Sequence, residues 1–233
     1  MTQNTEILME GSYNYFQNGT NYSQENFRVV HLPDSHAYSF NSEITSRIET
    51  GEFLKILVRY ELNQHFAPTK VRIEKSIGNK FALEIYEIDT ANLELFYTFQ
   101  NSQMSQEYTR NIGAKHYVAT PAVCTSALFT LTKKFDATGK TPIVLISSGN
   151  DWTYEGPPTE KTIYAEYATR EIADFKLNNS PLSASHLCLY ETDTSHASTA
   201  EPVNLYLSKH FSIPYQLFHR DLKVVIKNLK KIG

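Results

Sequence analysis

The sequence predicts an all-β protein built mainly from antiparallel strands. Apolar and polar residues alternate with a period of two in many short runs, a pattern typical of strands with one buried face. Turn signals rich in Gly, Asn, Asp and Pro separate these runs, and such short connections join antiparallel neighbours. The 15 Tyr and 13 Phe residues also favour strands, because flat rings pack well on a pleated surface.

The clearest predicted strand covers residues 53–62. One of its faces carries apolar side chains together with Tyr60, and the other carries Arg59 and Glu61. Little helix is expected anywhere in the chain. The same alternation predicts further strands at 70–76, 81–88, 93–99, 116–120, 127–133, 143–148, 162–168, 186–191, 203–208 and 222–229.

Two stretches fall outside this alternation. Residues 1–34 are rich in Asn, Gln, Ser, Tyr and Gly, and we expect them to be irregular and to lie at a sheet edge. Residues 191–202 are small and polar, which predicts an exposed loop. Neither stretch resembles a domain boundary, so residues 1–233 are expected to form one β-rich domain.

Charge and hydropathy argue against several function classes. The formal net charge is −3 and the Lys and Arg residues are scattered, whereas nucleic-acid-binding proteins concentrate their positive charge. No apolar run reaches the roughly 18 residues that a membrane-spanning helix needs. The N-terminal residues lack the features of a secretion signal, which predicts a cytoplasmic protein, or a periplasmic one if a signal was removed. A homodimer is compatible with the sequence.

No recognised cofactor or metal motif is present. The sequence contains no Gly-rich phosphate loop, no nucleophile elbow, no H-E-x-x-H and no close cluster of His, Cys and Asp. We therefore expect no cofactor and no metal. The two cysteines, Cys124 and Cys188, lack the C-x-x-C spacing and are expected to be packed thiols.

Two sets of residues are candidates for acid–base chemistry. Glu61 could transfer a proton and Arg59 could hold an anionic group if their face of the strand lines a concavity; the alternative is a solvated face with charge pairs. His116 and Cys124 flank Pro121 and could face one concavity, with His116 as a base. The alternative is a packed thiol, because apolar neighbours raise the pKa of a cysteine.

The only tryptophan, Trp152, lies in an aromatic stretch. Alternation places Trp152 and Tyr154 on one face, and the segment that contains Tyr164 could pair back against them. Together with Tyr60 and Cys124, these residues are the candidates for substrate binding. The alternative is that the same rings form part of the hydrophobic core.

One segment resembles a known family. An apolar strand at Pro142–Leu145, then Asp151-Trp152-Thr153-Tyr154 with Pro157, then Thr162-Ile163-Tyr164, is similar to the closing hairpins of VioE-type proteins of violacein biosynthesis. Those proteins share the incomplete antiparallel β-barrel of the lipoprotein carriers LolA and LolB. The resemblance implies a strongly curved or unclosed barrel. It also implies a cofactor-free enzyme that handles an aromatic intermediate, or a carrier of acyl chains.

Three hypotheses about function follow. The first is a cofactor-independent cyclase or isomerase of small-molecule biosynthesis, which acts on a hydrophobic or aromatic molecule in an apolar concavity. The second is a non-catalytic carrier or binder of a hydrophobic, lipid-like ligand. The third is an interaction module whose open sheet edge pairs with a partner strand. An enzyme needs titratable groups in the concavity, a carrier needs an apolar one, and an interaction module needs none.

Overall fold

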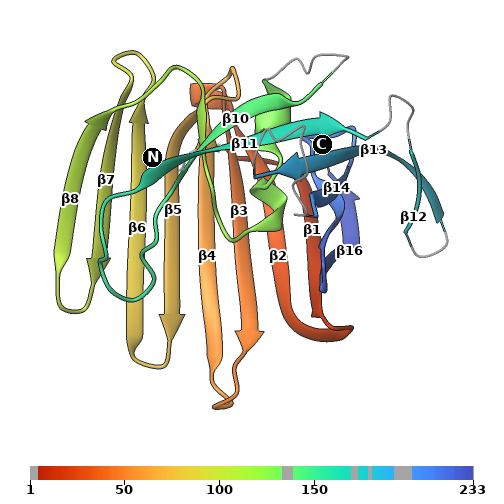
Figure 1. Ribbon diagram of the computed structural model, residues 1–233, viewed down its shortest axis with the longest axis horizontal. Coiled ribbons are helices and arrows are strands. Elements are labelled where there is room, and N and C mark those ends of the chain that lie inside the picture. The colour runs from red at the N-terminus through yellow and green to blue at the C-terminus, as the bar shows by residue number, and fades with distance from the viewer. Residues whose placement is uncertain (1–4, 133–138, 169–172, 178–179, 192–200, 233) are drawn as a thin grey trace.

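The computed structural model describes residues 5–132, 139–168, 173–177, 180–191 and 201–232. The first eight strands form what we call the N-terminal leaf (Figure 1): β1 (Glu6–Gln17), β2 (Thr20–Leu32), β3 (Ala37–Arg47), β4 (Phe53–Leu62), β5 (Pro68–Ile77), β6 (Lys80–Asp89), β7 (Glu94–Asn101) and β8 (Ser105–Asn111). The C-terminal leaf contains β9 (His116–Val118), β10 (Thr141–Ser147), β11 (Thr159–Tyr167), β12 (Ala173–Leu177), β13 (Ser180–Tyr190), β14 (Val203–Leu207), β15 (Pro214–His219) and β16 (Leu222–Lys231). The short 3-10 helices are η1 (Pro33–Ser35), η2 (Val123–Thr125) and η3 (Leu128–Leu131).

All the strands belong to one continuous, curved sheet. Its order is β8-β7-β6-β5-β4-β3-β2-β1-β16-β15-β14-β13-β11-β10-β9, and β12 pairs with β13 beside this path. Neighbours are antiparallel except β9 and β10, which are parallel. The path ends at β8 on one side and β9 on the other, so the sheet does not close. This confirms the predicted fold class, an all-β protein with a strongly curved, unclosed sheet.

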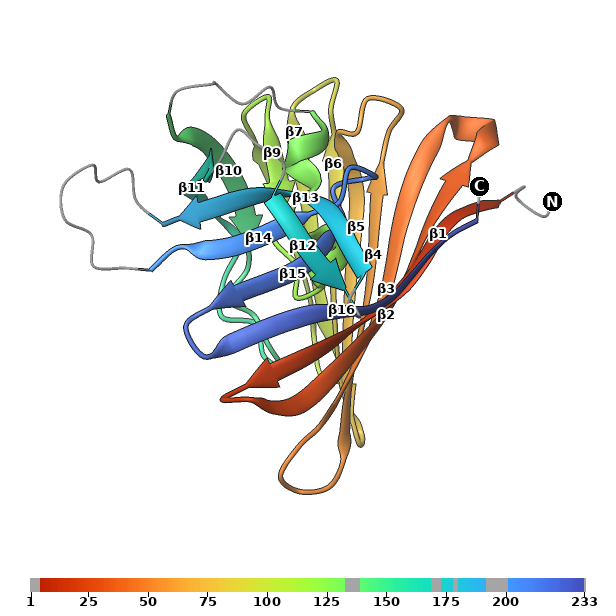
Figure 2. The ribbon, with the colours of Figure 1, turned by 90° about the vertical axis from the view of Figure 1, so that its right-hand side faces the viewer.

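The two leaves join where β1 pairs with β16 (Figure 2). Register shifts interrupt the pairing of β1 with both neighbours, at Ser12/Tyr13 toward β16 and at two places toward β2. Such irregularities increase the local bend and twist of a sheet. Gly11 lies in the same part of β1, and a Cβ there would meet the Phe27 ring at 2.5 Å and the Asn228 carbonyl oxygen at 2.8 Å. The lack of a side chain at Gly11 therefore permits the close approach of three strands at the bend.

An irregular segment fills the space between the leaves. Residues 112–132, which we call the crossing segment, follow β8 and contain β9, η2 and η3. One core cluster packs the inner face of the N-terminal leaf, with Tyr13, Phe40 and Tyr97 at 1% exposure or less, against residues of the crossing segment. A second cluster packs the other side of that segment, with Phe129, against the C-terminal leaf. The concave side of the sheet is therefore largely filled by protein.

Several predicted strands agree with the structure. The predicted strand at 53–62 is β4 with the same bounds. The Gly78-Asn79 turn signal lies between β5 and β6, and Gly78 has the positive φ of +51° that favours glycine.

Three expectations were wrong. Residues 1–34 were expected to form an irregular edge, but within the described part, 5–34, β1 and β2 lie in the middle of the sheet with neighbours on both sides. Their Asn, Gln and Ser side chains had suggested a loop, yet Tyr13, Tyr15 and Phe27 are buried. Residues 127–133 were expected to be a strand, but Leu128–Leu131 is η3. Of the predicted loop at 191–202, residues 192–200 lie outside the described residues.

The third error concerns the aromatic stretch. Trp152 and Tyr154 lie in the irregular connection between β10 and β11, so strand alternation does not apply to them. Tyr164 pairs in register with Pro142 and Tyr190 instead of pairing back against that stretch.

The bend at Gly11 generates a first prediction. Gly11→Ala should lower the free energy of unfolding by about 1–3 kcal/mol, because the new methyl group overlaps the Phe27 ring and a backbone carbonyl that cannot easily move. Gly113→Ala is the matched control, since a Cβ at Gly113 meets nothing within 4 Å, and it should change stability by about 0.5 kcal/mol or less. Urea unfolding monitored by circular dichroism measures both, and equal stabilities of the two variants would contradict the account of the bend.

Candidate functional site

A buried carboxyl group ties the crossing segment to the N-terminal leaf. Glu25, on β2, is 0% exposed. Its two oxygens accept hydrogen bonds from the backbone N–H groups of Val123 at 2.9 Å and Cys124 at 3.3 Å. They also accept from the hydroxyl groups of Ser42, at 2.9 Å, and Tyr15. Glu25 therefore supplies acceptors to backbone groups at η2 that no strand would otherwise pair.

This environment leaves the neighbouring groups protonated. Burial, followed by the nearby Glu25, raises the pKa of the Cys124 thiol well above its usual value near 9.0. Burial and Glu25 likewise raise the pKa of Tyr15 well above its usual value. Because the thiolate is the reactive form of cysteine, Cys124 is not set up as a nucleophile.

A second buried carboxyl group holds the start of the β10–β11 connection. Glu84, on β6, is 4% exposed and accepts hydrogen bonds from the hydroxyl groups of Tyr86 at 3.0 Å and Tyr97 at 2.9 Å. The Ser148 hydroxyl group also donates to Glu84. The Nζ atom of Lys75, a partly exposed residue, lies 3.6 Å from the same carboxyl group and forms an ion pair with it.

Asn150 continues this network into the aromatic stretch. Its amide nitrogen donates to the Tyr97 hydroxyl at 2.7 Å and to the Gly156 carbonyl at 2.9 Å. Its amide oxygen accepts from the backbone of Glu155 at 2.7 Å. The carbonyl of Trp152 accepts from Asn101 at 2.9 Å. Side chains of β7 therefore hold the β10–β11 connection in place by hydrogen bonds, although this connection has no regular secondary structure.

The rings of this connection pack against the core. Trp152 and Tyr154 are half-buried and contact the core cluster of the N-terminal leaf. The Tyr154 ring centroid lies 5.8 Å from that of Phe99. These contacts agree with the alternative in which the rings of both residues form part of the hydrophobic core.

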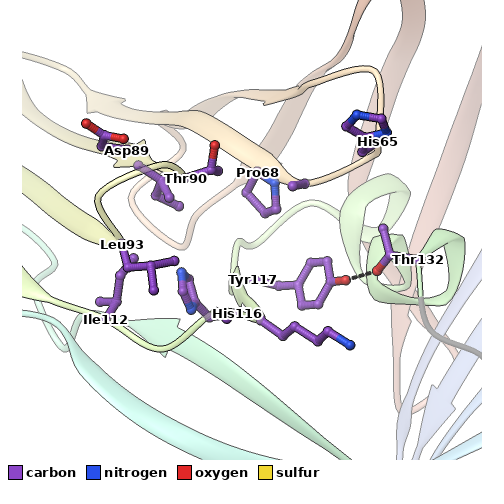
Figure 3. Close-up of a pocket in the computed structure, with 13 residues that line it drawn as sticks. His65, Pro68, Asp89, Thr90, Leu93, Ile112, His116, Tyr117 and Thr132 are labelled. Atoms are coloured by element: carbon purple, nitrogen blue, oxygen red, sulfur yellow. Dashed lines mark hydrogen bonds between the residues drawn. The ribbon is translucent and has the colours of Figure 1, made fainter.

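One cavity with space for a small ligand lies at one end of the N-terminal leaf (Figure 3). This cavity, which we call the His116 cavity, has a volume of about 210 Å³. Its walls come from the β4–β5 turn with the start of β5, from the β6–β7 turn, and from the start of the crossing segment. The lining includes the apolar side chains of Ala67, Pro68, Ile88, Leu93 and Ile112, and the polar side chains of His65, Asp89, Thr90, Lys115, His116 and Thr132.

His116 is the titratable group best placed in this cavity. The residue is 7% exposed, yet it lines the cavity, and no hydrogen bond joins its ring to another residue of the described part of the chain. Burial lowers the pKa of His116 below the usual value near 6.5. The charge of Glu160 partly offsets this lowering, and the charge of Arg110 adds to it. The imidazole is therefore neutral at pH 7, with one nitrogen that accepts a proton or a hydrogen bond.

The other candidate residues occupy different places. Arg59 and Glu61 form an ion pair at 2.7 Å on the face of β4 opposite Tyr60, with side chains 51% and 24% exposed. They form a solvated charge pair, and the structure does not bring them to His116. Tyr60 is 1% exposed, and its hydroxyl accepts the Val118 N–H at 2.9 Å, which is a further tie to the crossing segment. Cys124 lies in the Glu25 network, so His116 and Cys124 have different neighbours.

Sequence reasoning missed Glu25 and Glu84, although a signal was present. Each is an acidic residue in the apolar face of an alternating run, between Ser23 and Phe27 in one case and between Ala82 and Tyr86 in the other. A carboxyl group on the buried face of a strand needs several donors, and this requirement marks it as a residue that holds other chain segments.

Two further classes of site are absent from the described residues. No group of three or more His, Cys, Asp or Glu side chains in this part of the chain is placed to hold a metal ion. No helix in it has the length and apolar character needed to cross a lipid bilayer.

Comparison with known proteins shows that the chain is similar in fold to solved structures. No family model matches the chain, and no curated protein matches it. Among solved structures, the chain is similar to a β-barrel-like protein of the domain of unknown function DUF1849 from Brucella abortus, with a TM-score of 0.61, 7% identity, and coverage of 98% of this chain and 99% of that one. It is also similar to a DUF1089 family protein from Pseudomonas aeruginosa, with a TM-score of 0.53, 10% identity, and coverage of 85% and 90%. These likenesses support a barrel-like all-β fold, the coarser part of what the resemblance to VioE, LolA and LolB implied.

The Glu25 network generates a second prediction. Glu25→Gln should lower the free energy of unfolding by about 2–3 kcal/mol, because the amide keeps one acceptor oxygen and places an N–H₂ group against buried donors. The matched control is Glu43→Gln, where the side chain is 46% exposed and pairs with Lys55 at 2.8 Å; it should change stability by about 1 kcal/mol or less. Chemical denaturation measures both, and a Glu25→Gln protein as stable as the control would show that the network does not hold the crossing segment.

Proposed function

We propose that the protein binds a small, largely apolar molecule in the His116 cavity. One observation carries this proposal: a neutral imidazole without a hydrogen-bond partner in the described residues lines a cavity whose other walls are mostly apolar. Ligand sites combine apolar walls with a few polar groups that fix orientation. The cavity, at about 210 Å³, lies below the usual range of roughly 300–1,000 Å³ for drug-sized ligands, so its occupant is small.

The chemistry of the walls specifies the kind of molecule. Ile88, Leu93 and Ile112 favour an apolar ring or short chain. The neutral His116 ring offers an acceptor nitrogen, so the occupant should carry a hydroxyl or N–H donor beside its apolar part. A small phenolic or indolic compound has this combination, in accord with the hydrophobic or aromatic partner expected from the sequence.

Binding of a model compound tests the proposal. Phenol, which has a donor, should bind more tightly than toluene, which has the same ring without one. His116→Phe keeps an aromatic ring but removes the acceptor, so it should weaken phenol binding two- to tenfold, the equivalent of one hydrogen bond, and leave toluene binding unchanged. Chemical-shift titration of the labelled protein gives the affinities.

The matched control is His210→Phe, at an exposed histidine outside the cavity. It should bind phenol as the unaltered protein does. If neither phenol nor toluene binds saturably, or if His116→Phe binds phenol normally, this function is excluded.

The second candidate is proton-transfer catalysis of the isomerase or cyclase type without a cofactor. It is favoured by the lowered pKa of His116, which leaves a free base at neutral pH next to apolar walls. The resemblance of the 142–164 region to VioE-type proteins supports the same class. Glu61 and Arg59 lie on the other face of β4, so His116 alone among the acid–base candidates would carry the step.

The pH dependence of proton exchange tests this candidate. In deuterium oxide, the protein should accelerate exchange of the α-protons of a small cyclic ketone such as cyclohexanone. Because only the neutral imidazole is a base, the rate should rise with pH through the lowered pKa, below about 6.5, and be constant near pH 7. His116→Phe should abolish the acceleration. If the protein binds phenol but does not accelerate proton exchange, the binding function stands and the catalytic function is rejected.

A further inference from the structure

A second concave surface lies on the outer face of the sheet, where the two leaves join. Asn14 pairs with Val225, and Phe16 pairs with Lys223. Because alternate residues of a strand share a face, these four side chains lie on the same face of β1 and β16. β12 runs toward β16 (Figure 2) and contributes Lys176 to the same surface. The resulting groove, which we call the β12–β16 groove, has a volume of about 840 Å³. It is within the size range of sites for organic ligands.

The charge of this groove is unbalanced. It is lined by four cations and one acid: Lys176, Arg220, Lys223, Lys227 and Asp221. Asp221 accepts a weak hydrogen bond from Gln17 at 3.4 Å, and Arg220 acts at longer range on Glu191. Within the described ranges, none of the four cations has a carboxylate close enough to form an ion pair.

Several cations elsewhere on the sheet are paired. On the N-terminal leaf, Arg28 pairs with Glu10 at 2.7 Å and Arg72 with Glu74 at 2.6 Å. Lys55 pairs with Glu43 in the same way. Unpaired cations that line one groove create a positive potential, which attracts an anion.

The floor of the groove is suited to more than a simple anion. Phe16 and Val225 are half-buried and give it an apolar part. Asn14 also lines the groove, and its Oδ1 atom is buried without a hydrogen-bond partner among the described residues. Cations and apolar side chains therefore line the same volume.

We propose that the β12–β16 groove is a second binding site, and that it takes a free anionic amphiphile, a molecule that joins a phosphate or carboxylate group to an apolar chain. The lysines and Arg220 hold the head group, and Phe16 and Val225 contact the chain. This site is separate from the His116 cavity in both position and chemistry, because the cavity selects an uncharged molecule with a donor.

Calorimetric titration with decyl phosphate tests the proposal. Decyl phosphate should bind saturably as a monomer, whereas inorganic phosphate and decanol, which each lack one half of the molecule, should bind at least tenfold more weakly. The double variant Lys223→Glu/Lys227→Glu should weaken decyl phosphate binding at least tenfold. The control Lys230→Glu lies on the same strand outside the groove lining and should change it less than twofold. These lysines are exposed, so the variants are expected to fold, and Lys223→Gln/Lys227→Gln gives the same comparison without charge reversal.

Each remaining outcome rejects the proposal. Inorganic phosphate that binds as tightly as decyl phosphate would define a simple anion site. Cosedimentation with phosphatidylglycerol vesicles, without binding of monomeric decyl phosphate, would define a membrane-docking surface. Decyl phosphate binding that is insensitive to both double variants would place the ligand elsewhere. His116→Phe should not affect decyl phosphate binding, so this test is independent of the proposed function.

Discussion

The hydrogen bonds from the backbone of the crossing segment to Glu25 are the interaction on which the interior depends. The crossing segment has only a short strand and two short 3-10 helices, so many of its N–H and C=O groups have no partner within the segment. Each such group costs free energy if it is buried without a partner. Glu25 accepts two of these N–H groups, and Tyr60 accepts a third, from Val118. The segment can therefore lie between the two leaves, and the apolar residues of both leaves are buried against it.

Tyrosine hydroxyl groups make similar connections across the N-terminal leaf, which gives several buried tyrosines a role beyond packing. Tyr13, Tyr60 and Tyr97 are each at 1% exposure or less, and each uses its hydroxyl group to bind another part of the chain. A tyrosine can fill a core position with its ring and still reach a polar partner at its tip. Phenylalanine would supply the ring alone, and the buried Val118 N–H, for example, would lose its acceptor.

The filled interior decides where a ligand can bind. An unclosed barrel suggests a central concavity, but here the crossing segment and the 148–158 connection occupy that space. Two volumes available to a ligand are at the end of the N-terminal leaf, around His116, and on the outer face at β1 and β16. The lining of the first is mostly apolar and contains one aspartate and one lysine, whereas the lining of the second is mainly cationic. We therefore assign them different classes of ligand.

The sequence by itself determined the fold class and several of the strands. Strand β4 and the Gly78-Asn79 turn follow from local alternation and turn chemistry, which act over a few residues. Alternation also placed Tyr60 on one face of β4 and Arg59 and Glu61 on the other. It did not show which of these two faces the rest of the protein would cover. Only the tertiary structure decided that β1 and β2 are central, that Leu128–Leu131 forms η3, and that Glu25 binds the crossing segment. Glu25 and Val123 are 98 residues apart, and pairing over that distance depends on the curvature of the whole sheet, which no local pattern encodes.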